Sequence, residues 1–199
     1  MAYATTYQNF VGQIAIPNLS SDRPDGQLVT TLIERIEPNW LDTFFGVLTA
    51  INVQDQIDNT TNITPYKEIV DGATYIDLNG DTQVWVGLVN AKKFNPIANY
   101  IYCEYLKEKE IPLTNISGVK QANENGIRGD LSMKMARVWN DMVKFNYSLH
   151  DYLVSIKGTN ATFDSEYIGF KYDPYRMPYY RYDLMPNQLL FVEQNQFGI

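Results

Sequence analysis

The chain has 199 residues, of which 45% are hydrophobic and 20% charged, so it can build a substantial core and is not disordered throughout. Its net charge of −7 is opposite to that of a protein that grips nucleic acid over its whole surface. The lone Cys103 excludes an internal disulfide, and with one histidine in the chain it also excludes a Cys/His zinc cluster. We see neither a secretory signal nor the roughly 20 apolar residues of a membrane helix, so we expect no membrane and a reducing cytoplasm.

Residues 1–24 predict an extended N-terminal arm with one short strand. Apolar side chains are scattered here, at Val11, Ile14 and Ile16, and prolines and serines follow them. This pattern lacks the spacing of three and four residues that a buried helix face needs.

Residues 25–59 predict two helices. Asp25 is placed to cap the first helix, whose apolar residues extend to Ile36, and Pro38 suits the first turn of the second. We expect the second helix to bury an aromatic cluster and to continue its apolar face beyond Gly46 through Leu48 and Ile51. An asparagine- and threonine-rich loop then closes this unit.

Residues 74–86 predict a β-hairpin. Apolar and polar residues alternate on both sides of Asn79-Gly80, and this pair favours a two-residue turn in which both residues accept positive φ. A calcium loop is the competing interpretation of Asp77, Asn79 and Asp81. It fails on spacing, because the glycine and the bidentate glutamate of such a loop are missing at the required positions.

Two further helices are expected. Asn95-Pro96 predicts an N-cap followed by proline at the first helical position, and the apolar face of that helix extends to Leu106. After a glycine-bearing connection at 111–129, Asp130 is placed to cap the longest helix and Gly158 to terminate it. Its apolar positions follow a strict alternation of four and three along ~39 Å, at Leu131, Met135, Val138, Met142, Phe145, Leu149, Tyr152 and Ile156. An antiparallel bundle accommodates this seam more readily than a short coiled coil.

Residues 159–199 predict an aromatic C-terminal arm. Ten aromatic residues occur in 163–199, about twice the density of the whole chain, and three prolines oppose a helix. So many rings need a surface to cover them, either on the same domain or on a neighbouring subunit. Tyrosine and arginine together favour the neighbouring subunit. The predicted subunit-interface residues are Phe170, Tyr172, Tyr175, Arg176, Tyr179, Tyr180, Arg181 and Tyr182.

The sequence predicts no catalytic, cofactor or metal site. His150 follows a core position and is expected on the solvated flank of its helix, without a nucleophile motif beside it. We expect Cys103 to be a buried, unreactive thiol. Glu104 and Glu108 lie one helical turn apart and could act as an acid and a base, but flanking lysines favour a solvated helix edge.

The order of these features resembles the head–tail adaptor (connector) proteins of tailed bacteriophages, particularly those of phages that infect Bacteroides-type hosts. The resemblance covers roughly residues 25–157 and rests on patterns of aromatic and small residues. These are the hairpin ending in Trp85-Val86-Gly87-Leu88, the helix at 96–106, the connection at Gly118-Val119, and the long helix that ends in Tyr152-Leu153.

The elements above, together with this resemblance, predict a mainly α fold, an antiparallel helical bundle with one inserted β-hairpin and extended N- and C-terminal arms. The expected units are an arm at 1–24, a helical adaptor domain at 25–158 and the arm at 159–199. It further implies a structural protein of the virion neck, without enzymatic activity or cofactor, assembled in the host cytoplasm. The implied partners are copies of itself in a ring that is typically twelvefold, the portal protein, other neck or tail proteins, and genomic DNA. The DNA would pass through the lumen without sequence-specific binding, and an acidic wall would let it slide.

Other interpretations stay open. The tyrosines could serve as stacking platforms in a carbohydrate-binding module, or the chain could be a structural protein of the phage tail. An enzyme that works through carboxylates alone is a further alternative.

Overall fold

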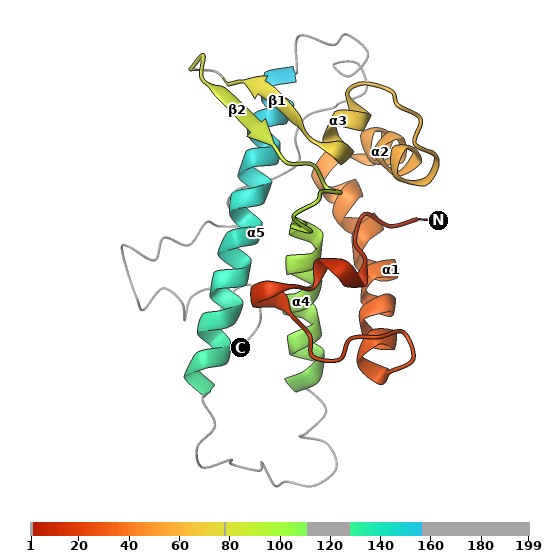
Figure 1. Cartoon of the computed structure of the whole chain (residues 1–199), viewed down its shortest axis with the longest axis vertical. Coiled ribbons are helices and arrows are strands. Elements are labelled where there is room, and N and C mark those ends of the chain that lie inside the picture. The colour runs from red at the N-terminus through yellow and green to blue at the C-terminus, as the bar shows by residue number, and fades with distance from the viewer. Residues whose placement is uncertain (1, 78, 111–127, 157–199) are drawn as a thin grey trace, which may run out of the picture.

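A computed structural model describes residues 2–77, 79–110 and 128–156 (Figure 1). The elements are two short 3-10 helices, five α-helices and two strands: η1 (Tyr7–Asn9), η2 (Gly12–Ile14), α1 (Pro24–Phe45), α2 (Val47–Asn59), α3 (Tyr66–Asp71), β1 (Ala73–Ile76), β2 (Thr82–Trp85), α4 (Pro96–Glu110) and α5 (Arg128–Ile156). The fold is therefore mainly helical with one antiparallel hairpin, as predicted.

The core lies where α4 packs between α1 and α5. In Figure 1 the chain ascends in α1, descends in α4 and ascends again in α5, so α4 is antiparallel to both neighbours. Asn95 caps α4 by accepting a hydrogen bond from the N–H of Ile97 (2.8 Å), which confirms the cap expected at Asn95-Pro96. Because Ile97, Ala98 and Ile101 have no exposed surface, this helix forms the centre of the bundle.

The apolar seam of α5 is confirmed over its described side chains. Met135, Val138, Met142, Leu149 and Tyr152 are buried, and Trp139 widens the seam. Phe145 and Ile156 pack at its margins. The helix begins at Arg128, so the prediction that Asp130 precedes it as an N-cap is wrong, and Gly158 lies outside the described residues.

One helix, α1, replaces the two expected on either side of Pro38. Proline cannot donate to the carbonyl of Glu34, yet the helix continues through it. Ile36 and Trp40 lie on the same buried face, and the Trp40 ring stacks on Phe44 with 4.6 Å between ring centroids. Packing on both sides of the proline outweighs the missing hydrogen bond. The helix starts at Pro24, and Asp25 lies in its first turn instead of capping it.

The N-terminal segment packs against its own protomer, and the short strand predicted for it is wrong. Phe10, Ile14 and Ile16 join the core, and the segment turns through η1 and η2. At Gly26 a Cβ would lie 1.8 Å from the carbonyl oxygen of Ser20, so only glycine allows the segment to cross α1 there.

A short helix, α3, was not expected and connects α2 to the hairpin. Its buried residues Tyr66, Ile69 and Val70 occupy too few turns to give a visible periodicity in the sequence. The indole N–H of Trp85 donates to the carbonyl of Ile69 (2.9 Å) and ties the end of β2 to α3.

Candidate assembly surfaces

The eight predicted subunit-interface residues, from Phe170 to Tyr182, lie outside the described residues. The described part of the chain has three other surfaces suited to binding. Two are exposed apolar faces, one on α2 and one on the hairpin, and the third is a polar groove between the hairpin and α5.

The α2 face consists of Val47, Leu48 and Ile51, each more than half exposed. The expected continuation of the buried apolar face beyond Gly46 is wrong, because Gly46 has φ 81° and ends α1. Helix α2 therefore takes a new direction and buries its opposite side through Ala50 and Val53. Gly46, the single residue between α1 and α2, therefore determines which aliphatic side chains of α2 contact solvent.

Ala2 lies along this side of α2. The amide of Ala2 donates to the Asp58 carboxylate, and the Gln54 side-chain amide donates to the carbonyl of Ala2 (2.9 Å). Val47, Ile51, Gln54 and Asp58 are spaced four, three and four residues apart, so they share one side of the helix.

The hairpin face consists of Thr74, Ile76, Thr82 and Val84. Strand pairing sets Thr74 opposite Val84 and Ile76 opposite Thr82, which places all four on one side of the sheet. All four are exposed, and Ile76 and Val84 are 58% and 61% exposed. The opposite side turns Tyr75 and Trp85 inward.

The turn of the hairpin differs from the two-residue turn expected at Asn79-Gly80. The N–H of Asp77 donates to the carbonyl of Asp81 (2.9 Å), so three residues form the connection. Gly80 has φ 89°. The Asp77 carboxylate accepts from the N–H groups of Asn79 and Asp81, both at 2.9 Å. These hydrogen bonds organise the turn in a way that the Asn-Gly pair alone does not specify.

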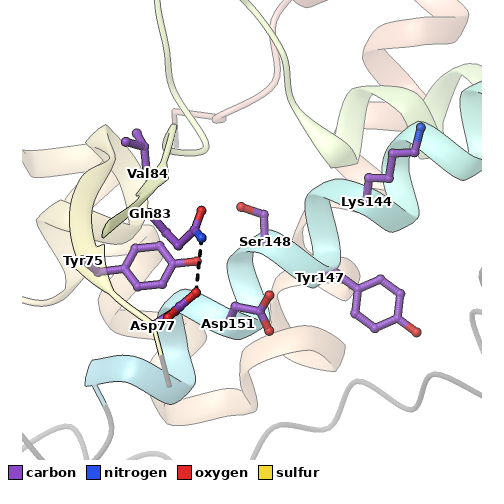
Figure 2. A pocket seen from close by; sticks show the side chains of 8 residues that line it. All are labelled: Tyr75, Asp77, Gln83, Val84, Lys144, Tyr147, Ser148 and Asp151. Carbon is purple, nitrogen blue, oxygen red and sulfur yellow. Dashed lines mark hydrogen bonds between the residues drawn. The ribbon is translucent and has the colours of Figure 1, made fainter. Parts of the chain in front are cut away.

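A groove of about 430 Å³ separates this hairpin from the C-terminal half of α5. Figure 2 shows Tyr75, Asp77 and Gln83 on the hairpin side, and Ser148 and Asp151 on the α5 side. Lys144, Tyr147 and Val84 complete its lining. The Tyr75 ring meets Tyr152 edge to face, with 5.5 Å between centroids, which fixes the wall of the groove against the core.

The electrostatics of the groove are dominated by Asp77 and Asp151. Hydrogen bonds from the backbone of Asp81 and from the Gln83 side chain lower the pKa of Asp77. The pKa of Tyr75 is raised, first by burial and then by the charges of Asp151 and Asp77. Lys144, the basic group of the lining, lies 3.6 Å from Asp141. Within the described residues neither Asp77 nor Asp151 forms an ion pair, so the groove presents two carboxylates.

The residues considered for catalysis are buried, half-buried or paired with basic side chains. Cys103 is fully buried, and burial raises its pKa to about 12. His150 is half-buried instead of fully solvated, and burial lowers its pKa. Glu104 pairs with Lys107 at 2.7 Å, and Glu108 lies 3.7 Å from Arg35 on α1. The two glutamates thus form ion pairs along the edge of α4.

A buried carboxylate, Glu37, escaped the sequence analysis. It has no exposed surface and accepts from the N–H groups of Ala4 (2.6 Å) and Thr5 (3.0 Å), one on each oxygen. Burial raises its pKa, while the hydrogen bonds from Thr5 and Ala4 oppose the shift. These bonds explain why the N-terminal segment lies on α1. The Glu37-Pro38 pair looked like a helix boundary, so the sequence offered no signal for this role.

Among the described residues, no three or more His, Cys, Asp or Glu side chains gather where they could hold a metal ion. None of the described helices combines the length and apolar character needed to cross a bilayer. Comparisons with protein-family models, curated proteins and solved structures find no match.

Proposed function

We propose that this chain is a structural protein of a tailed bacteriophage virion, that it is not an enzyme, and that it forms a ring in the neck. The ring would join the portal to the tail and continue the DNA channel. The resemblance between residues 25–157 and head–tail adaptors is the basis for the neck setting. The acidic net charge of −7 supports a lumen along which DNA slides without adhering.

The observation that carries the ring is the placement of two exposed apolar faces. In Figure 1 the hairpin and α2 lie at the same end of the molecule, on opposite sides of the bundle. When one face of a subunit packs on a different face of the next, the contact is heterologous and generates a closed ring if the rotation closes. The α2 face and the hairpin face together supply five exposed aliphatic side chains, Val47, Leu48, Ile51, Ile76 and Val84. Burying each stabilises the contact by about 1 kcal/mol.

The first experiment measures assembly and location. Native mass spectrometry and electron microscopy of the purified full chain should show one closed ring, which the resemblance expects to be twelvefold. Peptide mass spectrometry of purified virions should find about the same number of copies per particle. Absence from the particles, or hundreds of copies in each, would refute the neck assignment.

A matched pair of variants tests the α2 face. Leu48→Asp places a charge in the proposed contact and should leave a folded chain that no longer forms rings. Thr31→Asp adds the same charge at an exposed position of α1 and should assemble like the wild type. Rings of unchanged mass in Leu48→Asp, with circular dichroism of both variants intact, would remove the α2 face from the interface.

A further inference from the structure

The groove between the hairpin and α5 shares Val84 with the hairpin face, but its other lining residues belong to neither apolar face. The groove is polar and acidic, whereas the two apolar faces are mainly aliphatic. It lies over the last turns of α5. Asp77 and Asp151 approach it from different elements, and hydrogen bonds from the backbone of Asp81 and from Gln83 lower the pKa of Asp77. Together with Tyr75 and Tyr147, these carboxylates suit an occupant that carries both positive charge and aromatic rings.

The segment at 170–182 has this chemistry. It contains three basic side chains against one acidic in a chain whose net charge is −7, and six of its thirteen residues are aromatic. Pro174 and Pro178 favour an extended polyproline conformation, which aromatic-lined grooves commonly bind. Charge complementarity therefore matches this segment to the groove.

The length of chain after α5 bears on which copy supplies the segment. Arg176 lies twenty positions after Ile156, and the intervening chain spans up to ~60 Å when extended. Helix α5 itself is ~44 Å long, at 1.5 Å for each of its 29 residues. The groove of the same copy lies within about two turns of Ile156, so a much shorter connection would reach it. The available length suits the groove of an adjacent subunit.

We propose that the groove formed by Tyr75, Asp77, Gln83, Ser148 and Asp151 binds residues 170–182 of a neighbouring copy. Arg176 and Arg181 face the two carboxylates, and the tyrosines of the segment pack on Tyr75 and Tyr147. This inference rests on the proposed ring and adds to it the surface that receives the aromatic arm.

A charge-reversal cycle in the full chain tests the pairing. Asp151→Arg should raise the concentration at which half of the subunits assemble by about tenfold, and Arg176→Asp or Arg181→Asp should do the same. Combining Asp151→Arg with one of the arginine reversals should restore most of the loss. Asp42→Arg makes the same charge change at an exposed position of α1 and serves as the control.

Disulfide trapping identifies the copy. The double variant Ser148→Cys/Tyr179→Cys should give covalent dimers and longer oligomers on non-reducing gels under mild oxidation. Cys103 can stay in place, because it is buried and its pKa of about 12 leaves it protonated. A monomer without free engineered thiols would show that the segment returns to its own groove, and it would overturn the assignment to a neighbour.

The remaining outcomes separate this inference from the proposed function. Normal rings in Asp151→Arg, without trapping, would overturn the groove contact and leave the ring proposal intact. A wild-type chain that stays monomeric would overturn the ring itself. Saccharide binding on a glycan array that Asp151→Arg abolishes would overturn the peptide as occupant and assign the groove to a carbohydrate.

Discussion

Helices α1 and α2 are consecutive, carry the same kinds of aliphatic residue and differ in what covers them. Leu32 in α1 is 1% exposed, whereas Leu48 in α2 is 51% exposed. The difference arises at Gly46, whose positive φ turns the chain away from the bundle after α1 has packed on α4. In α1 the apolar face is used within the protomer, and in α2 part of it remains available to another molecule. The spacing of hydrophobic residues therefore identifies an apolar face that needs a partner. It does not say whether that partner lies in the same protomer or in another molecule.

The largest expected effect comes from truncating Leu32 in α1, with the exposed Leu48 of α2 as the comparison. Leu32→Ala should lower the free energy of unfolding by about 3 kcal/mol, because it removes a buried side chain and leaves a cavity. Leu48→Ala should cost less than about 0.5 kcal/mol in the monomer, since solvent already covers much of the side chain. Urea unfolding, at protein concentrations too low for assembly, measures both changes in the free energy of unfolding.

In assembly the order of the two effects should reverse, so that Leu48→Ala weakens ring formation more than Leu32→Ala does. Leu48→Ala should weaken ring formation more than its small effect on unfolding predicts, and Ile51→Ala should behave alike. Equal unfolding costs for Leu32→Ala and Leu48→Ala would contradict the exposure of the α2 face.

The second effect concerns the buried carboxylate of α1. Glu37→Ala leaves the N–H groups of Ala4 and Thr5 without their acceptor and should cost about 2 kcal/mol. Hydrogen exchange should show faster exchange at these two amides. If their protection is unchanged, the N-terminal segment is held by its apolar contacts alone.

The pH dependence of Glu37 has a definite sign. Its raised pKa means that the folded state binds the proton more tightly than the unfolded state. Its contribution to stability is therefore greatest below the ordinary carboxyl pKa and falls as the pH rises through the raised value. Glu37→Gln cannot titrate, so the stability of the wild type relative to this variant should decrease over that range. A difference that grows with pH would mean that the hydrogen bonds outweigh burial.

The smallest effect lies in the hairpin turn. Gly80→Ala meets no atom within 4 Å, so its cost comes only from placing a side chain at φ 89°. We expect about 1 kcal/mol, or a melting temperature lower by about 2–4 °C. Thr74→Ala, on the same hairpin, is the control and should change the melting temperature little. A loss as large as that of Leu32→Ala would place this turn in the folding core.

Local signals predicted the parts of the fold that local chemistry determines. The cap at Asn95, the hairpin and the seam of α5 each depend on residues a few positions apart. The course of the N-terminal segment depends on Glu37, more than thirty residues away, and the continuation of α1 through Pro38 depends on packing against other elements. No spacing rule within one segment contains that information.

For the candidate site, the sequence predicts that the aromatic arm needs a partner but does not point to the groove proposed to bind it. The interface residues from Phe170 to Tyr182 remain a prediction. The groove joins positions 75–84 to positions 144–151, which the packing of the hairpin on α5 brings together, with Tyr75 in contact with Tyr152. In the sequence, the polar residues of the hairpin and those of the long helix each have the pattern of an ordinary solvent-exposed surface. Only the fold places them on opposite sides of one groove.

The anchoring of Ala2 on α2 has a practical consequence for anyone who labels this protein. Because Gln54 and Asp58 hold the N-terminus on the same side of the helix as Val47 and Ile51, an affinity tag or fluorescent domain fused there would sit beside the α2 face. Such a fusion would block the α2 face sterically. A monomeric preparation of the fusion would therefore say little about the assembly of the untagged chain. Tags are better inserted at an exposed position outside α2, such as the loop at Lys92.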